Sequence, residues 1–333
     1  MPKRLVDLRG QTPLLDIASY GRRGPWRAHS LTTSQIHHIA RTVHRVPEVM
    51  VKVSGGARTV RGVGEHLNYI GRDGEGVVEG DDGRLHQEKG FENRLLEDWD
   101  LDLEEHRRHS DRAIAAGRKP PKLVQNLVFS MPKGTPPDKL YAAVKKFTME
   151  NFALQHRYAM ALHTDQGHPH VHVVVKALGD NGKRLNIRKA TLRAWRRDFA
   201  GYLRDFGVEA NATERAVRGE ITPRKTDGIY RTMMRRDSRH ARERAEGVVR
   251  ELAAGKLRSE PGTEVLKATR RAVLEGWHGV ADVLDRERRP GLAAAVRQFA
   301  ESMRPPWTER ELIANRIQPP AKSREIEDRS VTR

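Results

Sequence analysis

Four histidines stand within ten residues of the segment HTDQGHPHVHVVVK, which runs from His163 to Lys176. Imidazole nitrogens are common ligands of divalent metal ions, and several histidines on one surface predict a metal site better than a lone histidine does. Successive side chains of a strand point to opposite faces, so His168, His170 and His172 share one face while the valines between them point to the other. The segment therefore predicts a strand with a metal-binding face and an apolar face.

The preceding stretch, RYAMALH, ends at His163 and alternates in the same way. If the two stretches pair as a hairpin with His163 opposite His170, apolar residues meet apolar residues throughout. A slip of one residue would turn the valines toward the polar face, which core packing forbids. Ala161 then lies opposite His172 and leaves it room. We predict that His163, His170 and His172 bind one divalent ion, and that the turn swings His168 away from it.

Three neutral imidazoles leave coordination positions open, so the ion could polarise a carbonyl, generate hydroxide or clamp a phosphate oxygen. The net charge of +18 over 333 residues favours phosphate, because a surplus of this size attracts nucleic acid. The chain has no cysteine, which excludes disulfides, thiolate ligands and a cysteine nucleophile. A tyrosine could serve instead, because a DNA hydroxyl can reseal a phosphotyrosine ester.

Among the six tyrosines, Tyr69 is the strongest candidate for the nucleophile. It lies near the end of a helix expected between Thr59 and Gly71, about 140° from the centre of its apolar stripe at ~100° per residue. Tyr202 flanks the apolar stripe of a later helix, and Tyr158 falls on the apolar face of the hairpin. The others are Tyr20, Tyr141 and Tyr230.

The elements that position these residues follow from the hydrophobic pattern. Strands are expected at residues 49–53, 122–130, 157–163 and 168–176, and helices at 59–71, after Thr135 and at 189–206. Residues 71–90 are rich in glycine and predict a mobile insertion, and the acidic run at 97–105 predicts a solvated helix face or loop. The order predicts an α/β (α+β) domain of two layers, an antiparallel sheet with helices on one face.

Three regions are expected along the chain. Residues 1–45 form a basic N-terminal extension, residues 46–222 the α+β domain, and residues 223–333 a helical, basic region with a disordered tail. The N-terminus lacks the apolar stretch of a secretory signal, and no run approaches the ~20 apolar residues of a membrane span. The sequence thus predicts a cytoplasmic protein.

The string HTDQGHPHVHVVV closely resembles the third motif of the conjugative and mobilisation relaxases, both MobA-like and T-DNA-border-nuclease-like. These enzymes belong to the HUH endonuclease superfamily, whose H-U-H signature corresponds to His170-Val171-His172. GEHLNYIGRDG resembles their first motif, which carries the nucleophilic tyrosine. The resemblance covers about residues 46–222 and implies an HUH-nuclease, ferredoxin-like palm.

By this resemblance Tyr69 is the nucleophile, and Asp165 and His168 are expected as second-shell or proton-relay groups at the catalytic site. The ion is Mg²⁺ or Mn²⁺, held by the three histidines. The resemblance implies single-stranded DNA at an origin of transfer as the substrate, a type IV coupling protein and accessory mobilisation proteins as partners, and export through a type IV secretion system. The cations expected to contact DNA are Arg72, Lys176, Arg188, Lys189, Arg193, Arg196 and Arg197.

Three alternatives stay open. A rolling-circle replication initiator would use the same chemistry, with a tyrosine after the histidine motif, which here would be Tyr202. A metal-stabilised DNA-binding accessory protein would bind origin DNA without cutting it. The third is a three-histidine hydrolase that acts on a small molecule, which would not explain the net charge of +18.

Overall fold

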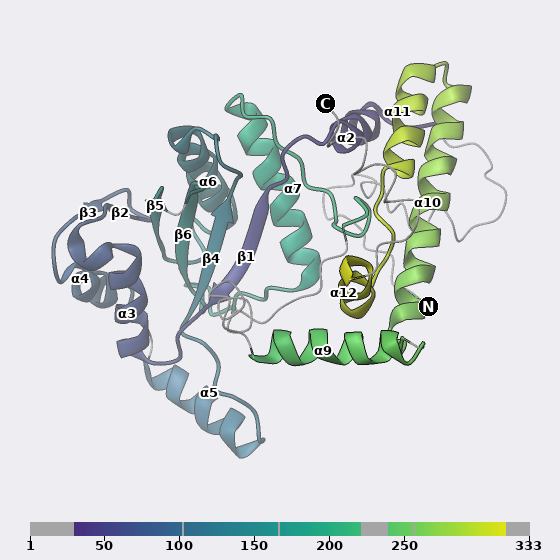
Figure 1. Cartoon of the computed structure of the whole chain (residues 1–333). Helices are drawn as coiled ribbons and strands as arrows, with labels where there is room; N and C mark the ends of the chain where they lie inside the picture. The colour runs from purple at the N-terminus through teal and green to yellow at the C-terminus, as the bar shows by residue number, and fades with distance from the viewer. Residues whose placement is uncertain (1–29, 102, 166, 221–238, 256, 318–333) are drawn as a thin grey trace. The chain divides into compact units, whose positions relative to one another are not determined.

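The computed structural model describes residues 30–101, 103–165, 167–220, 239–255 and 257–317 (Figure 1). The chain divides into two compact units. One is Arg45–Ala212, close to the expected 46–222, and the other combines residues 1–44 with 213–333. No helix in the described ranges is both long enough and apolar enough to cross a membrane.

The unit Arg45–Ala212 is built on one six-stranded sheet in the order β1-β4-β6-β5-β2-β3, and neighbouring strands run antiparallel. Together with its helices, the sheet confirms the predicted α+β class. The strands are β1 (Met50–Gly55), β4 (Val124–Ser130), β6 (His170–Lys176), β5 (Tyr158–His163), β2 (Val78–Gly80) and β3 (Leu85–His86).

Two helices, α6 (Pro137–Asn151) and α7 (Lys189–Asp205), pack on one face of this sheet. Phe129 of β4 lies at the centre of that layer, with its ring centroid 4.7 Å from Phe147 of α6 and 5.2 Å from Phe199 of α7. The valines of β6 that alternate with the histidines are buried in the same core. Because each such side chain contributes about 1.5–3 kcal/mol on burial, this face fixes the orientation of β6.

The opposite face carries α3 (Val60–Ile70) and α4 (Phe91–Asp98), which Figure 1 shows on the other side of the strands from α7. Leu67 and Phe91 are buried there with Ala161 of β5. The expectation that helices pack on one face only is therefore corrected. Small apolar residues such as Ala161 leave part of the histidine face flat enough for a helix to pack on it, so the domain has a third layer.

The glycine-rich insertion after Gly71 adds to the sheet. It contains a short 3₁₀ turn (Arg72–Gly74) and then the strands β2 and β3. Glu79 of β2 is buried, accepts a hydrogen bond from the hydroxyl of Tyr141 at 2.6 Å, and pairs with Lys145 Nζ at 2.6 Å. Strands this short carry no readable alternation, which is why the sequence predicted only a mobile insertion.

The acidic run divides between two helices. Glu97 and Asp98 end α4, and Glu104 and Glu105 lie in the first turn of α5 (Leu103–Ala115). Carboxylates are favourable in the first turn of a helix because the helix dipole is positive there. The run is only partly solvated, because Trp99 and Leu101 within it are buried in the core beneath α3 and α4.

In the second unit, α2 (Thr33–Val43) shares one apolar core with α10 (Thr263–Arg286) and α11 (Pro290–Glu301). Ile39 of α2 and Trp277 of α10 are both buried in it. The N-terminal region is thus not a separate extension, because its described helix completes the core of the C-terminal region. The remaining helices of this unit are α9 (Arg239–Ala253) and α12 (Glu309–Ile317). The predicted disordered tail lies largely outside the described residues.

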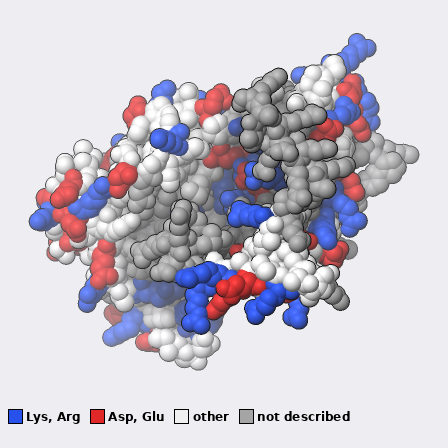
Figure 2. Space-filling view, viewed as in Figure 1, with Lys and Arg blue, Asp and Glu red and all other residues white. Residues whose placement is uncertain are grey.

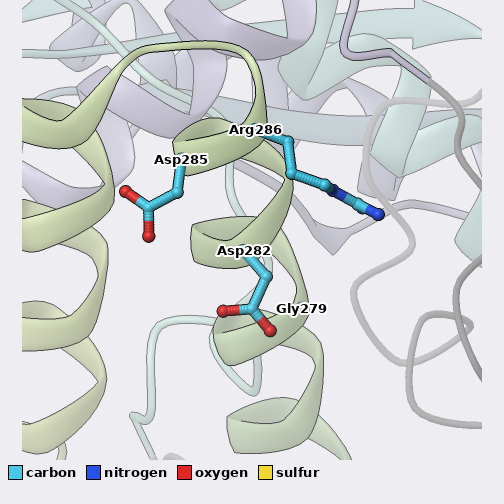
Figure 3. Close-up of a pocket in the computed structure, with 4 residues that line it drawn as sticks. All are labelled: Gly279, Asp282, Asp285 and Arg286. Carbon is cyan, nitrogen blue, oxygen red and sulfur yellow. The ribbon is translucent and has the colours of Figure 1, made fainter.

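A shallow pocket on α10 is lined by Gly279, Asp282, Asp285 and Arg286, and Figure 3 shows the two carboxylates on neighbouring turns. Arg297 pairs with both, at 3.1 Å from Asp282 and 2.7 Å from Asp285. Since Arg297 already pairs with both carboxylates, this acidic pair carries no argument for a cation site.

Candidate metal centre and nucleophile

The β5–β6 hairpin has the predicted register. His163 pairs with His170, and Ala161 pairs with His172. The three imidazoles gather on one face, with ring centroids 5.4 Å apart for His163–His170, 4.8 Å for His163–His172 and 5.0 Å for His170–His172. One ligand nitrogen from each ring lies within 4.8 Å of the others, so the cluster could hold a single metal ion.

Hydrogen bonds orient two of these rings. His163 Nε2 lies 2.8 Å from the carbonyl oxygen of Ile70, and His170 Nδ1 lies 3.2 Å from that of His168. A nitrogen that donates to a carbonyl leaves the other ring nitrogen as a free ligand, which is the usual outer-shell arrangement of a metal-binding histidine. The donor set thus fits a divalent ion, which His163 Nδ1 and His170 Nε2 would hold together with His172.

The surroundings favour the neutral form of two of these rings, His170 and His172. Burial lowers the pKa of His172 to about 4, and the neighbouring histidines and the cations Lys52 and Arg72 contribute to that shift. Burial also lowers the pKa of His170. Because a metal ion binds unprotonated imidazole, these two rings are ready to bind an ion at neutral pH.

His168 lies outside this group. Its side chain is exposed, and its ring centroid is 5.8 Å from that of His170. Its hydrogen bond to the cluster is made by its carbonyl oxygen, which accepts from His170 Nδ1. This geometry agrees with the prediction that only the other three histidines bind the metal, which stays a prediction.

Tyr69 stands beside the cluster at the end of α3. Thr59 caps the start of that helix by accepting the backbone N–H of Gly62 at 3.1 Å, as predicted. The ring of Tyr69 is 58% exposed, and its centroid lies 5.7 Å from that of His172 and 6.4 Å from that of His163. An exposed phenol next to three inward-facing histidines is accessible to an incoming phosphate.

Gly71 lets the helix end approach the α4 layer. A Cβ at this position would come within 2.5 Å of the Phe91 ring, so any side chain would force the two apart. The predicted helix ends at Gly71, as the structure shows. The φ of −83° at Gly71 shows that close packing is the reason for the glycine.

The other described tyrosines lie on the opposite side of the sheet from the histidines. Tyr141 and Tyr158 contact the α6 layer on the far side of the sheet, and burial raises the pKa of both. The hydroxyl of Tyr202 donates to Glu150 at 2.5 Å, and its ring packs against Phe147 on that same side. Tyr20 and Tyr230 lie outside the described residues. Of the described tyrosines, only Tyr69 lies on the histidine face.

Asp165 makes an ion pair with Arg72, in the turn after Tyr69, rather than a hydrogen bond to a histidine. The hydrogen bond from the Arg72 guanidinium lowers the pKa of the Asp165 carboxyl. Both side chains are partly exposed. The pair joins the β5–β6 turn to the segment that carries the tyrosine, and the proton-relay role of Asp165 and the DNA contact of Arg72 stay predictions.

We expect Asp165→Asn to slow covalent attachment of DNA to Tyr69 by less than about tenfold, because an exposed ion pair is worth only ~0.2–1 kcal/mol. Metal affinity should stay unchanged, since Asp165 contacts no ligand ring. Single-turnover kinetics and metal titration on the variant measure the two effects. A loss of metal binding would instead place Asp165 in the metal centre.

The cations predicted to contact DNA do not surround the histidines. Lys176 is buried and lies 3.5 Å from Asp180, so its assignment as a DNA contact is corrected; as the last residue of a central strand it is covered by neighbouring chain. Helix α7 packs on the face opposite the histidines, and Arg196 Nη2 donates to the carbonyl of Val51 at 3.1 Å. Arg188, Lys189 and Arg193 are exposed, and Arg197 is half-buried.

Replacing Arg188 and Lys189 by glutamine together should leave the nicking rate of a short oligonucleotide within about twofold of the wild type, because α7 lies across the sheet from Tyr69. Binding of long single strands should weaken if DNA extends over that helix. Nicking assays with oligonucleotides of two lengths separate these effects. A large loss of nicking on the short substrate would contradict the placement of α7 away from the site.

Sequence reasoning missed a second basic surface on α5 and the loop after it. Figure 2 shows Lys and Arg side chains gathered where α5 lies, at the lower edge of the view. The exposed cations of this surface are Arg107, Arg108, Arg112, Arg118 and Lys119. The signal was present as HRRHSDR, but the preceding acidic run drew the interpretation toward a solvated acidic segment.

Residues 69–207 match the family described as "Relaxase: MobA/VirD2-like, nuclease domain". This part of the chain is thus similar to the nuclease domain of MobA/VirD2-like relaxases, and the match begins at Tyr69 and includes the three histidines.

Two T-DNA border endonucleases named VirD2 are similar to this chain. That of Agrobacterium fabrum (strain C58 / ATCC 33970) is 33% identical over 132 residues, which cover 36% of this chain and 29% of that protein. That of Rhizobium rhizogenes is 32% identical over 108 residues, covering 29% and 25%. The match thus spans less than a third of either relative.

A solved structure titled "Molecular Basis of Vancomycin Resistance Transfer in Staphylococcus aureus" is also similar. It shares 10% sequence identity with a TM-score of 0.31, and the match covers 51% of this chain and 99% of that one.

Proposed function

We propose that this protein is a conjugative or mobilisation relaxase that nicks one DNA strand at an origin of transfer and becomes joined to it through Tyr69. The observation that carries the proposal is the position of Tyr69, exposed at the end of α3 with its ring 5.7 Å from that of His172. The MobA/VirD2-like family of the domain supports the same reaction class.

The reaction exchanges one phosphoester for another. The phenol oxygen of Tyr69 forms a bond to phosphorus while the bond to the 3′-oxygen breaks, and the proton lost by the phenol is balanced by one gained at that oxygen. The products are a 5′-phosphotyrosine link and a free 3′-hydroxyl, and the reverse reaction religates the strand. An ion held by His163, His170 and His172 would neutralise charge on the nonbridging phosphate oxygens.

The chemistry of the ligands bears on the choice of ion. Imidazole nitrogen suits Mn²⁺ better than Mg²⁺, which prefers oxygen ligands, although availability also decides which ion is bound. The hydrogen bond from His163 to Ile70 links one ligand directly to the residue after Tyr69. We infer that this contact fixes the distance between the nucleophile and the phosphate held at the ion.

DNA beyond the nick would contact the exposed cations of α5 and, further away, those of α7, so affinity should fall steeply with salt. A type IV coupling protein and accessory mobilisation proteins are the partners that such a reaction requires. The VirD2 relatives are named for cutting T-DNA borders, and we infer an equivalent origin in the DNA that carries this gene.

The replication-initiator alternative needs Tyr202 at the histidines. Tyr202 belongs to α7, on the opposite face of the sheet, and its hydroxyl donates to Glu150. This arrangement favours Tyr69 and hence the relaxase. The accessory-protein alternative predicts DNA binding without covalent attachment.

The test uses the full-length protein and single-stranded oligonucleotides tiled across the DNA that flanks its gene. With Mn²⁺ or Mg²⁺ present, one oligonucleotide should form an adduct that resists denaturation, and peptide mapping should place the DNA on Tyr69. Binding of the tiles without any adduct would support the accessory protein instead.

A further inference from the structure

Lys52 of β1 lies in the same cross-strand row as His172. Lys52 pairs with Val128 of β4, and Val128 pairs with His172 of β6. Directly opposed residues of antiparallel strands share a face, and neighbouring strands lie ~4.8 Å apart. Lys52 therefore belongs to the histidine face, with its Cα about 10 Å from that of His172 by this spacing.

Tyr69 approaches the cluster from the other direction. The residue after it, Ile70, accepts a hydrogen bond from His163 of β5 through its carbonyl oxygen, and β5 lies on the side of β6 away from β1. In an in-line displacement the attacking and leaving oxygens stand on opposite sides of phosphorus. A phosphate held at the histidines and attacked by Tyr69 thus has its leaving 3′-oxygen directed toward β4 and β1, where Lys52 stands.

The side chain of Lys52 is exposed, and within the described ranges no carboxylate lies at ion-pair distance from it. Arg72 is the other cation that interacts electrostatically with His172, and it is already paired with Asp165. The residue between Lys52 and His172, Val128, is buried and offers no charge. Lys52 can therefore bind an anion without breaking an existing ion pair.

A lysine on an edge strand has an alternative explanation. β1 is the edge of the sheet, and lysines on edge strands discourage pairing with another chain. That role would suit a charge at any exposed position of β1. It does not account for a lysine in the row of His172, on the leaving-group side, and it predicts no effect on DNA.

We propose that Lys52 binds the DNA segment 5′ of the nick, through the phosphate nearest its new 3′-hydroxyl, and so retains that segment for religation. The inference rests on the proposed function, because this 3′-end exists only after Tyr69 has cleaved the strand. Once the other segment is joined to Tyr69, only non-covalent contacts hold the 3′-end. A cation on its terminal phosphate slows its loss and favours the reverse reaction.

The test compares Lys52→Gln with the wild type, using the labelled product oligonucleotide that ends in the 3′-hydroxyl. Losing one phosphate contact should lower the slope of log K against log salt by about 0.7, which corresponds to about fourfold weaker binding at 0.15 M salt. The rate of adduct formation at saturating intact DNA should change less than about twofold. The adduct fraction at equilibrium should rise, because the released segment religates less often.

Two variants control for charge and folding. Lys52→Arg keeps the cation and should behave like the wild type. Lys139→Gln removes an exposed lysine from α6, on the opposite face, and should change neither the salt slope nor the adduct fraction. An unchanged salt slope and adduct fraction in Lys52→Gln, or an equal loss in Lys52→Arg, would overturn the proposal.

Failure of the proposed function gives a different result. If the wild type forms no adduct on any tiled oligonucleotide, the relaxase assignment falls. Lys52 is then tested by the binding of labelled dT20 over the same salt series. A slope lower by about 0.7 in Lys52→Gln alone would still support a phosphate contact, and equal slopes in all variants would exclude it.

Discussion

Tyr69→Phe should abolish nicking and covalent attachment of DNA while leaving the fold and DNA binding intact. The substitution removes only the attacking oxygen, and loss of a nucleophile typically costs at least ~10³-fold in rate. The ring is 58% exposed and lies off the buried stripe of α3, so the free energy of unfolding should change by less than ~0.5 kcal/mol. Denaturing gels with a labelled oligonucleotide measure the adduct, and thermal melting checks the fold.

Tyr202→Phe is the matched control. It removes the same hydroxyl from the opposite face of the sheet, where that group donates to Glu150. The adduct should form at a rate close to that of the wild type. An adduct that survives in Tyr69→Phe and disappears in Tyr202→Phe would falsify the relaxase assignment in favour of an initiator.

The hairpin could be predicted from the sequence because two constraints act on the same residues. Alternation puts the histidines of β6 on one face and its valines on the other, and the core then allows only the register that sets His163 opposite His170. The structure confirms that register. The helix that carries Tyr69 was predicted for a similar reason, since its N-cap and apolar stripe are both local.

The layer on which each helix packs could not be predicted, because that choice depends on contacts between residues distant in sequence. The apolar stripe of α7 indicates that it packs on a sheet without indicating which face. Its arginines therefore looked like candidates for the DNA path, although Trp195 and Phe199 bury the helix opposite the histidines. The alignment of Lys52 with His172 could not be predicted for the same reason. It depends on the pairing of β1 with β4.

The same limit applies to the N-terminal region. Thr32 and Gln35 form a capping box at the start of α2, a local signal for a helix. Its partner helices lie more than 200 residues away, where Trp277 completes the core around Ile39. A sequence pattern can predict such a helix but cannot show where it packs. The sequence therefore predicts only an extension for residues 1–45.

Replacing His163, His170 or His172 by alanine should remove metal binding and nicking together. Each ring supplies one of three ligand nitrogens, all within 4.8 Å of one another. Two remaining imidazoles therefore bind the ion more weakly than three. Outer-shell changes typically cost 10–100-fold in metal affinity, and loss of a direct ligand should cost more than ~100-fold. Calorimetric titration with Mn²⁺ on the three single variants measures the loss, with circular dichroism to verify folding.

His168→Ala is the informative fourth variant, because it separates a ring that binds metal from one that does not. The hydrogen bond between His168 and the cluster is made by its backbone carbonyl, which accepts from His170 Nδ1 and which alanine retains. Metal affinity should therefore stay within a few-fold of the wild type, while nicking falls only in part. Equal loss of Mn²⁺ binding in all four variants would show that His168 is also a ligand. Intact binding in His163→Ala would show that the ion sits on β6 alone, because β5 contributes no other histidine to the cluster.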